Sequence, residues 1–600
     1  MSPRDSHQPH DAGKRNAVVS ERAPLLPSPS DNHDGLRAKK VQASQDDSSI
    51  SSDSTNLTKD GFDPKQAITL SRAAICAVAL SCLIFLQATN ISLLTTTQSR
   101  IAEEFDSFEK VSWFTSSYLI AMSAVSPLMG KLASVFAPGV CIFASTVILS
   151  IGVLACSVAN GFGLFILGRV LTGIGASGIL TIALIIVLEL SSAKHRGLTI
   201  ALLNTWFTIG VAVGATAAGA LLEPIGWRAL FWLQSIVALS GGGVLLFAIP
   251  WDFRAHTAGS EHDKSRSMLR RLAALDYLGA LTLTLSIVLM LYALSSPRKI
   301  PILPLVLSAI VLVTFVIIEV YVAQDPIIPV KLLKSRGLLM TCFGTVGFMM
   351  ARWSVLFYTP TYALAVRQWP PAAAGSILIP TNLGFAVGGL VVGAFHIRRH
   401  GSFYFACILV YAIFPISLVS LAMLSNQHTN PWLYVAIVFI NGAIAGAALN
   451  YTLAHILHLT PKSTHYIATS LAATFRGFAG SFGSAIGGGI FTRTLHASLE
   501  DGFAKENRTG ARVEELIRRL LGSPALVERL DDLEKEVAIH GYEHALKVLW
   551  LAGAGLSVAM IFVQAGAGWS SGEEAAETDG MGKGDVRGVQ AVRDEEQSNH

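Results

Sequence analysis

The stretch from Phe162 to Trp232 reads FGLFILGRVLTGIGASGILTIALIIVLELSSAKHRGLTIALLNTWFTIGVAVGATAAGALLEPIGWRALFW, and it decides the fold. Two apolar segments, 162–188 and 198–222, lie on either side of a short basic link at 194–196. A helix needs about 20 residues to cross about 30 Å of hydrocarbon, because it rises about 1.5 Å per residue. The stretch therefore predicts two consecutive membrane-spanning helices.

Both segments have features that a simple membrane anchor does not need. Arg169 lies inside the first segment, where a charge is energetically unfavourable and usually functional. Small residues follow it, and the second segment has small residues along one face. Those that we expect to pack against other helices and to allow movement are Gly173, Gly210, Gly214 and Gly219. The combination favours a transport protein.

Three motifs resemble those of Major Facilitator Superfamily transporters. Residues 168–176, GRVLTGIGA, resemble the arginine motif of the fourth helix, and residues 210–219 resemble the antiporter motif of the fifth. Gly226-Trp227-Arg228 resembles the start of helix six in the fourteen-helix drug:H+ antiporter branch, which includes fungal vacuolar amino acid and multidrug transporters. The resemblance covers about residues 72–566. It implies an all-α membrane protein with 14 transmembrane helices, formed by two six-helix halves plus two inserted central helices.

The composition agrees with a polytopic membrane protein. Hydrophobic residues make up 52% of the chain and charged residues only 14%, whereas soluble domains have roughly 25% charged residues. The net charge of +4 is small, and the basic residues are spread over short loops, so no nucleic-acid partner is expected. The six cysteines lie in apolar segments without a metal-ligand spacing. We expect no metal, no cofactor and no enzymatic activity, because the sequence has no nucleotide-binding loop or nucleophile elbow.

Fourteen apolar segments can be distinguished along the chain. They lie at about 73–95, 111–131, 139–158, 162–188, 198–222, 229–250, 274–295, 301–322, 338–358, 372–395, 402–424, 432–458, 467–492 and 546–566. We therefore expect a disordered cytosolic tail at 1–70, an amino-terminal six-helix half at 71–250, and inserted helices seven and eight at 251–325. A carboxyl-terminal half at 326–566 and a second disordered tail at 567–600 complete the chain.

The distribution of basic residues predicts the orientation. Lys and Arg are more frequent in the short loops on the side of the amino terminus, which places both termini in the cytosol. The hydrophilic stretch 494–545 then lies on the opposite side. Within it, Asn507 begins a glycosylation sequon, and two short surface helices are expected at 513–521 and 526–537, separated by a break at 522–524.

The amino-terminal tail contains a possible sorting signal. Glu21 precedes Leu25 and Leu26 in the acidic-x-x-x-Leu-Leu form that adaptor proteins recognise on cytosolic tails. The signal resembles those of fungal vacuolar membrane transporters. A chance Leu-Leu pair in a long tail is the alternative interpretation.

Candidate residues for proton coupling lie in or near the apolar segments. The family motif implies a coupling role for Arg169, whose guanidinium stays protonated and would act as a fixed counter-charge; a structural arginine is the alternative. Glu189 and Glu319 are acids near the cytosolic ends of segments, where a carboxylate drawn into low dielectric can exchange protons. Solvated end residues are the alternative for both. Asn90 stands where the branch usually has an aspartate, so the usual first-helix proton site is absent.

Other polar residues are candidates for the substrate cavity. Arg352 and Arg476 are cations within apolar segments that would meet a substrate carboxylate or bond backbone carbonyls between helices. Asn382 and Asn450 add amides to segments ten and twelve. Three arginines inside the membrane favour an anionic group on the substrate, whereas a cavity for cations would be expected to hold carboxylates.

The resemblance and the dileucine signal together predict a secondary active transporter of small organic solutes. The first interpretation is proton-coupled uptake of amino acids, basic ones in particular, into the vacuole; its partners would be the solute, protons, the bilayer and a sorting adaptor. A plasma-membrane multidrug or toxin efflux antiporter is the alternative. A membrane sensor that has lost transport is a third reading, because Asn90, Ser134 and Ala215 depart from the family motifs.

Overall fold

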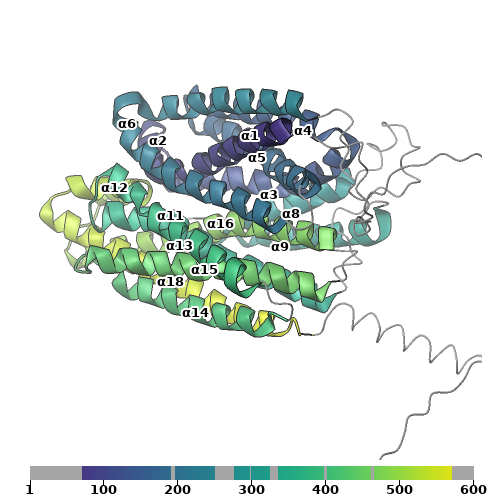
Figure 1. Cartoon of the computed structure of the whole chain (residues 1–600). Helices are drawn as coiled ribbons and strands as arrows, with labels where there is room; N and C mark the ends of the chain where they lie inside the picture. The colour runs from purple at the N-terminus through teal and green to yellow at the C-terminus, as the bar shows by residue number, and fades with distance from the viewer. Residues whose placement is uncertain are drawn as a thin grey trace, which may run out of the picture. The chain divides into compact units, whose positions relative to one another are not determined.

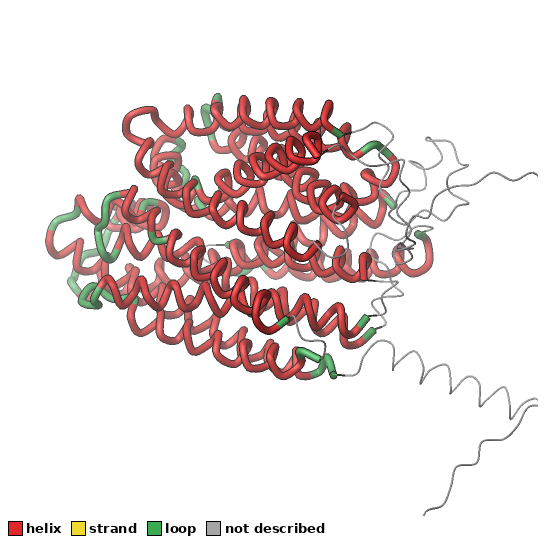
Figure 2. Tube along the Cα trace, in the orientation of Figure 1, coloured by secondary structure: helices red, strands yellow, loops and turns green. Residues whose placement is uncertain are grey.

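The computed structural model describes residues 70–190, 196–249, 276–296, 299–323, 335–397, 402–460 and 465–569. All of them belong to one compact unit, Gln66–His600. The described residues are nearly all helical and include no strand (Figure 2). The sorting residues Glu21, Leu25 and Leu26 lie outside the described residues.

The amino-terminal half is built from six helices and one short turn. They are α1 (Leu70–Ser92), α2 (Leu94–Glu104), η2 (Phe108–Lys110), α3 (Ser112–Val135), α4 (Pro138–Ser157), α5 (Phe162–Leu190) and α6 (Arg196–Ala248). α6 includes both segments predicted at 198–222 and 229–250. It is interrupted at Gly226, whose φ of 75° and ψ of 162° are not helical and suit a residue without a Cβ.

The central and carboxyl-terminal helices follow in the predicted order. They are α8 (Tyr277–Leu294), α9 (Ile302–Ile317), η4 (Ile318–Val322), α11 (Arg336–Ala365), α12 (Pro371–Ser376), α13 (Leu378–Val391), η5 (Val392–His396), α14 (Tyr404–Leu424), α15 (Pro431–Leu459), α16 (His465–Lys505), α17 (Ala511–Gly522), η7 (Pro524–Arg529) and α18 (Asp532–Ala565). At the start of two of these helices, a side chain caps the helix by accepting a hydrogen bond from a backbone amide. Asp276 accepts a bond from the Gly279 amide at the start of α8, and Asn430 accepts one from Trp432 at the start of α15.

Among the described residues, eleven helices are long and apolar enough to cross a membrane. One of them, Leu203–Ala248, is 46 residues long and covers two predicted spans. α3 and α16 are outside these eleven, although each matches a predicted segment. The all-helical membrane fold is therefore confirmed, and the number of fourteen spans stays a prediction.

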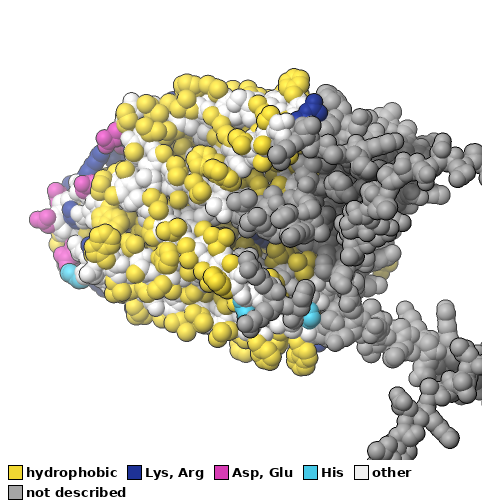
Figure 3. Space-filling model, viewed as in Figure 1, with side chains coloured by type: hydrophobic (Ala, Val, Ile, Leu, Met, Phe, Trp, Pro, Cys, Tyr) yellow, Lys and Arg dark blue, Asp and Glu magenta, His cyan; other side chains and the backbone are white. Residues whose placement is uncertain are grey.

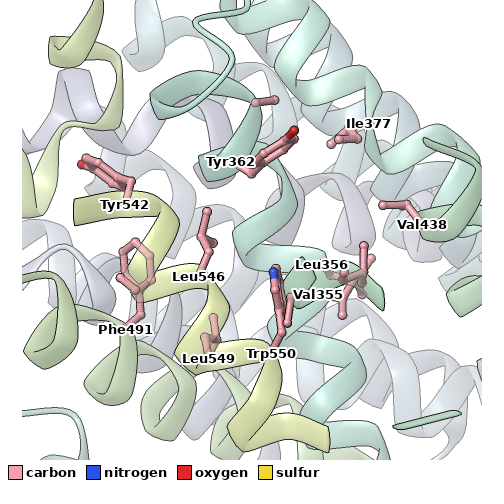
Figure 4. Close-up of a cluster of buried hydrophobic side chains, with 14 of the residues drawn as sticks. Val355, Leu356, Tyr362, Ile377, Val438, Phe491, Tyr542, Leu546, Leu549 and Trp550 are labelled. Carbon is pink, nitrogen blue, oxygen red and sulfur yellow. The ribbon is translucent and has the colours of Figure 1, made fainter. Parts of the chain in front are cut away.

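The two halves, which we define as α1–α6 and α11–α18, are centred on two apolar clusters, and the cluster of the second half also includes Ala88, Val211 and Ala215 of the first. Figure 1 shows the first in purple and blue and the second in green and yellow. In the second core, Phe491, Tyr542, Leu549 and Trp550 from α16 and α18 pack toward α11 (Figure 4). α8 and α9 pack on each other through reciprocal Ser286–Ser308 hydrogen bonds of 3.0 and 2.8 Å. The domain boundaries themselves stay a prediction.

The outer surface is apolar where lipid is expected. Large hydrophobic side chains such as Phe247 and Tyr321 are 80% and 82% exposed, and Figure 3 shows hydrophobic groups over most of the visible face. Lys, Arg, Asp and Glu side chains gather at one end of that face. In water this surface would be unfavourable, so the chain is a multi-pass membrane protein.

The helices around the stretch 494–545 differ from the sequence-based expectation. α17 matches the surface helix expected at 513–521, but the one expected at 526–537 is wrong, because η7 is followed by α18 from Asp532. α16 also continues to Lys505. Both helices continue because they pack on each other beyond the predicted spans: Leu499 and Phe503 of α16 are buried, and a Cβ at Gly541 of α18 would lie 2.8 Å from Leu499.

α13 and α15 pack most closely at glycines. A Cβ at Gly442 of α15 would overlap the carbonyl oxygen of Thr381, and one at Gly446 would overlap that of Phe385. These neighbours are backbone atoms, which cannot move aside as a flexible side chain can. The two helices therefore depend on glycine at these positions.

We predict that Gly442→Ala lowers the thermal stability of the purified protein, by an overpacking penalty of about 1–3 kcal/mol. This exceeds the gain of about 1 kcal/mol that alanine normally brings to a helix. Gly243→Ala in α6 is the matched control, because nothing lies within 4 Å of its added Cβ. A melting temperature of Gly442→Ala equal to that of the wild type would contradict this packing.

Asn507 tests the orientation of the chain. It is exposed just after α16 and has a φ of 54°, a conformation that asparagine tolerates. We predict that deglycosylation increases the gel mobility of the wild type and that Asn507→Gln removes this shift. A wild type that carries no glycan would argue against placing this end of the molecule on the non-cytosolic side.

Candidate functional site

Arg169 is the centre of a buried polar site in the amino-terminal half. Its side chain is 0% exposed on α5. Nε donates to the carbonyl oxygen of Phe114 on α3 at 2.8 Å, and Nη1 donates to Oδ1 of Asn90 on α1 at 2.5 Å. The guanidinium also lies 4.5 Å from the ring centroid of Tyr118. One cation thus connects three helices through neutral partners.

Asn90 extends this network to a fourth helix. Its Nδ2 donates to Oε1 of Gln234 on α6 at 2.8 Å, and Nε2 of Gln234 donates to the carbonyl oxygen of Leu230 at 2.7 Å. Arginine can only donate, so Asn90 must turn its oxygen toward Arg169 and its nitrogen toward Gln234. An aspartate would have no donor for Gln234. The amide at position 90, which sequence reasoning treated as the loss of a proton site, therefore has a bonding role of its own.

Several buried atoms around this network have no hydrogen-bond partner among the described residues. They include Nη2 of Arg169, Oη of Tyr118 and Oε1 of Gln87. A buried polar atom without a partner is destabilising by about 1–3 kcal/mol. The site therefore keeps capacity for a water, a solute group or a rearranged partner.

The four predicted glycines lie where helices cross. A Cβ at Gly173 would overlap the carbonyl oxygen of Tyr118, so α5 meets α3 beside the arginine. Gly210 and Gly214 bring α6 against Phe85 and Thr89 of α1. Gly219 lies against Pro371 of α12, where a Cβ would be 2.6 Å from the carbonyl oxygen, and so connects the two halves.

The substrate-cavity candidates do not gather around Arg169. Arg352 is 3% exposed and binds Thr381 of α13 through its hydroxyl at 2.6 Å and its carbonyl at 3.2 Å. Asn382 and Asn450 donate to carbonyls of their own helices, at 2.8 and 3.0 Å. Arg476 of α16 donates to Asn204 of α6 at 3.1 Å, across the two halves. Arg352 thus bonds a backbone carbonyl of another helix, which was one of the two interpretations, whereas Arg476 bonds a side-chain amide; their roles in substrate binding stay a prediction.

Of the two acidic candidates for proton coupling, the structure describes the side chain of Glu319 but not that of Glu189. Glu189 lies near the end of α5, and its side chain is outside the described part of the protein. Glu319 is 5% exposed in η4, so its interpretation as a solvated end residue is wrong. It lies on the side of η4 that faces α8, whereas Val320, Tyr321 and Val322 on the same element are exposed.

Sequence reasoning missed a line of hydroxyl groups between the halves. Ser116 of α3 lies 3.2 Å from Ser484 of α16, oxygen to oxygen. The Ser123 hydroxyl lies 2.9 Å from the carbonyl oxygen of Gly477 and 3.3 Å from the Ser481 hydroxyl. The spacing of seven residues between the two serines of α3 places them on one helix face, and this was the available signal.

A second missed feature explains the Gly-Trp-Arg motif. Arg228 pairs with Glu104 of α2 at 2.5 Å and donates to the carbonyl oxygens of Ser157 and Ala159 at 3.0 and 2.8 Å. The indole nitrogen of Trp227 donates to the same carboxylate at 2.7 Å. The motif thus ties the ends of α2 and α4 to the start of the second part of α6.

A partly open cavity of about 60 Å³ lies between the halves, and we call it the chamber. Its walls come from α2, η2 and α3 on one side and from α11, α16, the end of α17 and the start of η7 on the other. The lining is mixed. Its polar residues are Thr95, Gln98, Glu109, Ser112, Thr115, Tyr358, Thr361, Ser484 and Thr492, and its apolar side chains include Phe108, Val111, Phe357, Phe491 and Leu521. Sequence reasoning missed the chamber because its residues are far apart in the chain.

α17 closes the chamber at the end that the basic-residue distribution places on the non-cytosolic side. Arg518 pairs with Asp106 at 2.6 Å, and its guanidinium lies 5.4 Å from the Phe108 ring centroid. A Cβ at Gly522 would lie 2.5 Å from Cα of Phe108. Hydrogen bonds from Arg518 and Arg519 lower the pKa of the Glu515 carboxyl to about 2, so this ion cluster remains charged in a mildly acidic compartment.

We predict that Asn90→Ala destabilises the protein more than Asn382→Ala, although both asparagines are buried. Asn90 accepts from a charged donor, which is worth about 1.5–3 kcal/mol, and it also holds Gln234. Asn382 bonds only within its own helix. Melting temperatures of the two purified variants measure the difference, and equal decreases would contradict the network.

Comparison with known proteins agrees with this architecture. The model of the Major Facilitator Superfamily matches residues 80–484. The vacuolar membrane amino acid uptake transporter fnx2 of Schizosaccharomyces pombe is 25% identical over 77% of this chain and 79% of its own. The efflux pump apf11 of Gibberella fujikuroi is 26% identical over 80% of this chain and 84% of its own.

A solved structure supports the same fold. The inward-facing, unoccupied crystal structure of a bacterial homologue of the human lysosomal transporter Spinster superposes with a TM-score of 0.55 and 13% identity. It covers 84% of this chain and 100% of that protein. The family match extends over more than half of the chain and includes the Arg169 network and the line of serines up to Ser484. This multi-pass membrane protein therefore belongs to the Major Facilitator Superfamily.

Proposed function

We propose that this protein is a secondary active transporter that takes up amino acids, basic ones in particular, into the vacuole in exchange for protons. The observation that carries the proposal is the small chamber between the halves, whose lining combines hydroxyl groups and one carboxylate with aromatic and aliphatic side chains. A cavity of about 60 Å³ with a mixed lining suits part of a small solute that has both polar and apolar groups. Sites for drug-sized molecules are mostly apolar and have volumes of about 300–1,000 Å³.

The contacts between the halves support alternating access. Along α3 and α16 they are hydroxyl–hydroxyl and hydroxyl–carbonyl contacts, each with a net value of about 0.5–1.5 kcal/mol. Contacts of this strength can be exchanged for water during a rocking movement of one half against the other. α6 meets α12 at a second place, where a Cβ at Gly219 would lie 2.6 Å from the carbonyl oxygen of Pro371 and one at Gly375 would lie 2.5 Å from that of Ala215.

In this mechanism, Arg169 is a fixed charge. It holds α1, α3, α5 and α6 in one arrangement, with Asn90 as its neutral partner. The network contains only an amide at the usual first-helix proton position, so we propose that the coupling proton binds elsewhere, with Glu189 as the candidate near the cytosolic end. Arg352 and Arg476 then act as braces between helices.

The vacuolar location rests on the dileucine signal at Glu21, Leu25 and Leu26 and on the likeness to fnx2, an amino acid uptake transporter of the vacuolar membrane. The likeness to the efflux pump apf11 favours drug export at the plasma membrane as the second candidate. The small volume of the chamber, about 60 Å³, supports the first candidate over the second, because sites for drug-sized molecules have volumes of about 300–1,000 Å³.

Uptake of labelled lysine, histidine and a neutral amino acid into sealed vacuolar vesicles tests the proposal. We expect uptake that depends on the protein and is lost when the pH gradient is dissipated. Arg169→Ala should lower the rate at least tenfold, because Phe114 and Asn90 lose their shared donor. Arg512→Ala, an exposed arginine on α17, is the control and should transport normally. Vesicles that contain the protein but accumulate no amino acid would exclude the proposal and favour drug export.

A further inference from the structure

The side-chain amide of Gln564, in the last turn of α18, is buried without a hydrogen-bond partner. The side chain is 0% exposed, and neither Oε1 nor Nε2 forms a hydrogen bond with the described residues. The same is true of the hydroxyl of Tyr411 on α14, which is 1% exposed. Buried polar groups are destabilising when they are left unpaired. These groups therefore favour a bound ligand that can both donate and accept.

Gly344 of α11 brings the two side chains to one place. A Cβ at this position would lie 3.3 Å from Oε1 of Gln564 and 3.6 Å from Oη of Tyr411. Both oxygens thus border the side of α11 from which a side chain is missing. A place of about the size of one methyl group is enough for one water molecule.

The groups around this place are held by other contacts. The hydroxyl of Tyr404 donates to the carbonyl oxygen of Ala565 at 2.8 Å, which fixes the last turn of α18 beside α14. Thr345 lies beside the Tyr411 hydroxyl, but its own hydroxyl donates within α11 at 2.7 Å. The Tyr411 ring stacks on Phe348, with centroids 5.2 Å apart. The unpaired groups are therefore held in position by the fold.

The surroundings favour a neutral ligand. The ionisable groups beside the Tyr411 hydroxyl, among the described residues, are the thiols of Cys342 and Cys407, so an ion would meet no acidic or basic side chain there. In Gln564, Oε1 requires a donor and Nε2 an acceptor. Water supplies both, and a buried water typically forms about three hydrogen bonds. A larger polar molecule does not fit, because both side chains are closed off from solvent.

We propose that the carboxyl-terminal half binds water at Gly344, with one molecule between Oε1 of Gln564 and the hydroxyl of Tyr411. The site joins the last turn of α18 to α11 and α14 near their starts. The basic-residue distribution places this end of the helices on the cytosolic side. The site does not depend on which solute is transported, so it goes beyond the proposed function.

Radiolytic labelling of the purified full-length protein tests the site directly. X-ray pulses turn bound water into hydroxyl radicals that oxidise the adjacent side chains, and mass spectrometry identifies the modified residues. We expect Tyr411 to be labelled in the wild type, at least tenfold more than Tyr542. Tyr542 is the matched control, because it is 0% exposed but its hydroxyl donates to the carbonyl oxygen of Leu520. Gly344→Ala should lower the labelling of Tyr411 to the level of Tyr542.

Thermal stability gives a second readout, in which the direction of the change decides. If water is bound, Gly344→Ala displaces it and leaves both side chains unpaired, so the melting temperature falls by about 2 °C or more. Without water, alanine would raise it through its higher helix propensity. Gly553→Ala on α18 is the control and should not lower it. Its Cβ would lie 3.5 Å from Cβ of Ala351 and 3.6 Å from Cδ1 of Leu418, which are apolar.

A wild type in which Tyr411 is labelled no more than Tyr542 would overturn the water site, and this readout needs no variant. Equal labelling of Tyr411 in the wild type and in Gly344→Ala would overturn its placement, as would a Gly344→Ala protein that melts at or above the wild-type temperature. Gln564→Leu separates water displacement from simple crowding. In that background Gly344→Ala should cause no further decrease, and an undiminished decrease would contradict the site.

Discussion

The amino-terminal half depends on the burial of one guanidinium among neutral groups. An isolated charge in a low-dielectric interior is strongly destabilising unless it is hydrogen-bonded. Arg169 meets this requirement with a backbone carbonyl, an amide oxygen and an aromatic ring, contributed by α3 and α1. Since these partners carry no charge, the helices that provide them are held in place without an opposing ion whose protonation would change the arrangement.

In the carboxyl-terminal half, the buried cation is Arg352, and its hydrogen-bond partners differ from those of Arg169. Arg352 is satisfied by both oxygens of a single threonine, so it connects only α11 and α13. The close approach of α13 and α15 through Gly442 and Gly446 then provides the remaining rigidity. The two halves share a helical plan, but in one a polar network ties four helices together and in the other the tightest crossing is made by small residues.

The sequence predicted the helical membrane fold, the burial of Arg169 and the close packing at Gly210 and Gly214, because length, hydropathy and small-residue spacing are local properties. It could not predict the Gln234 partner of Asn90 or the chamber. Asp106 and Arg518 are 412 residues apart, and no local pattern pairs two charges in separate loops. The early start of α18 was also missed, since its charged first turns are helical only because they pack on α16. The roles of the candidate site residues stay predictions.

The length of α16 has a mechanical consequence. Its 41 residues extend about 60 Å, twice the thickness of the hydrocarbon layer. Together with the first turns of α18, the far end forms a stiff arm that carries α17. A tilt of about 10° displaces a point about 25 Å along such an arm by about 4 Å. A displacement of this size is larger than the 2.6 Å distance between the Arg518 guanidinium and the Asp106 carboxylate, so it would break this ion pair. A rotation too small to disturb the packed interior is therefore amplified at the tip, where it separates the two halves.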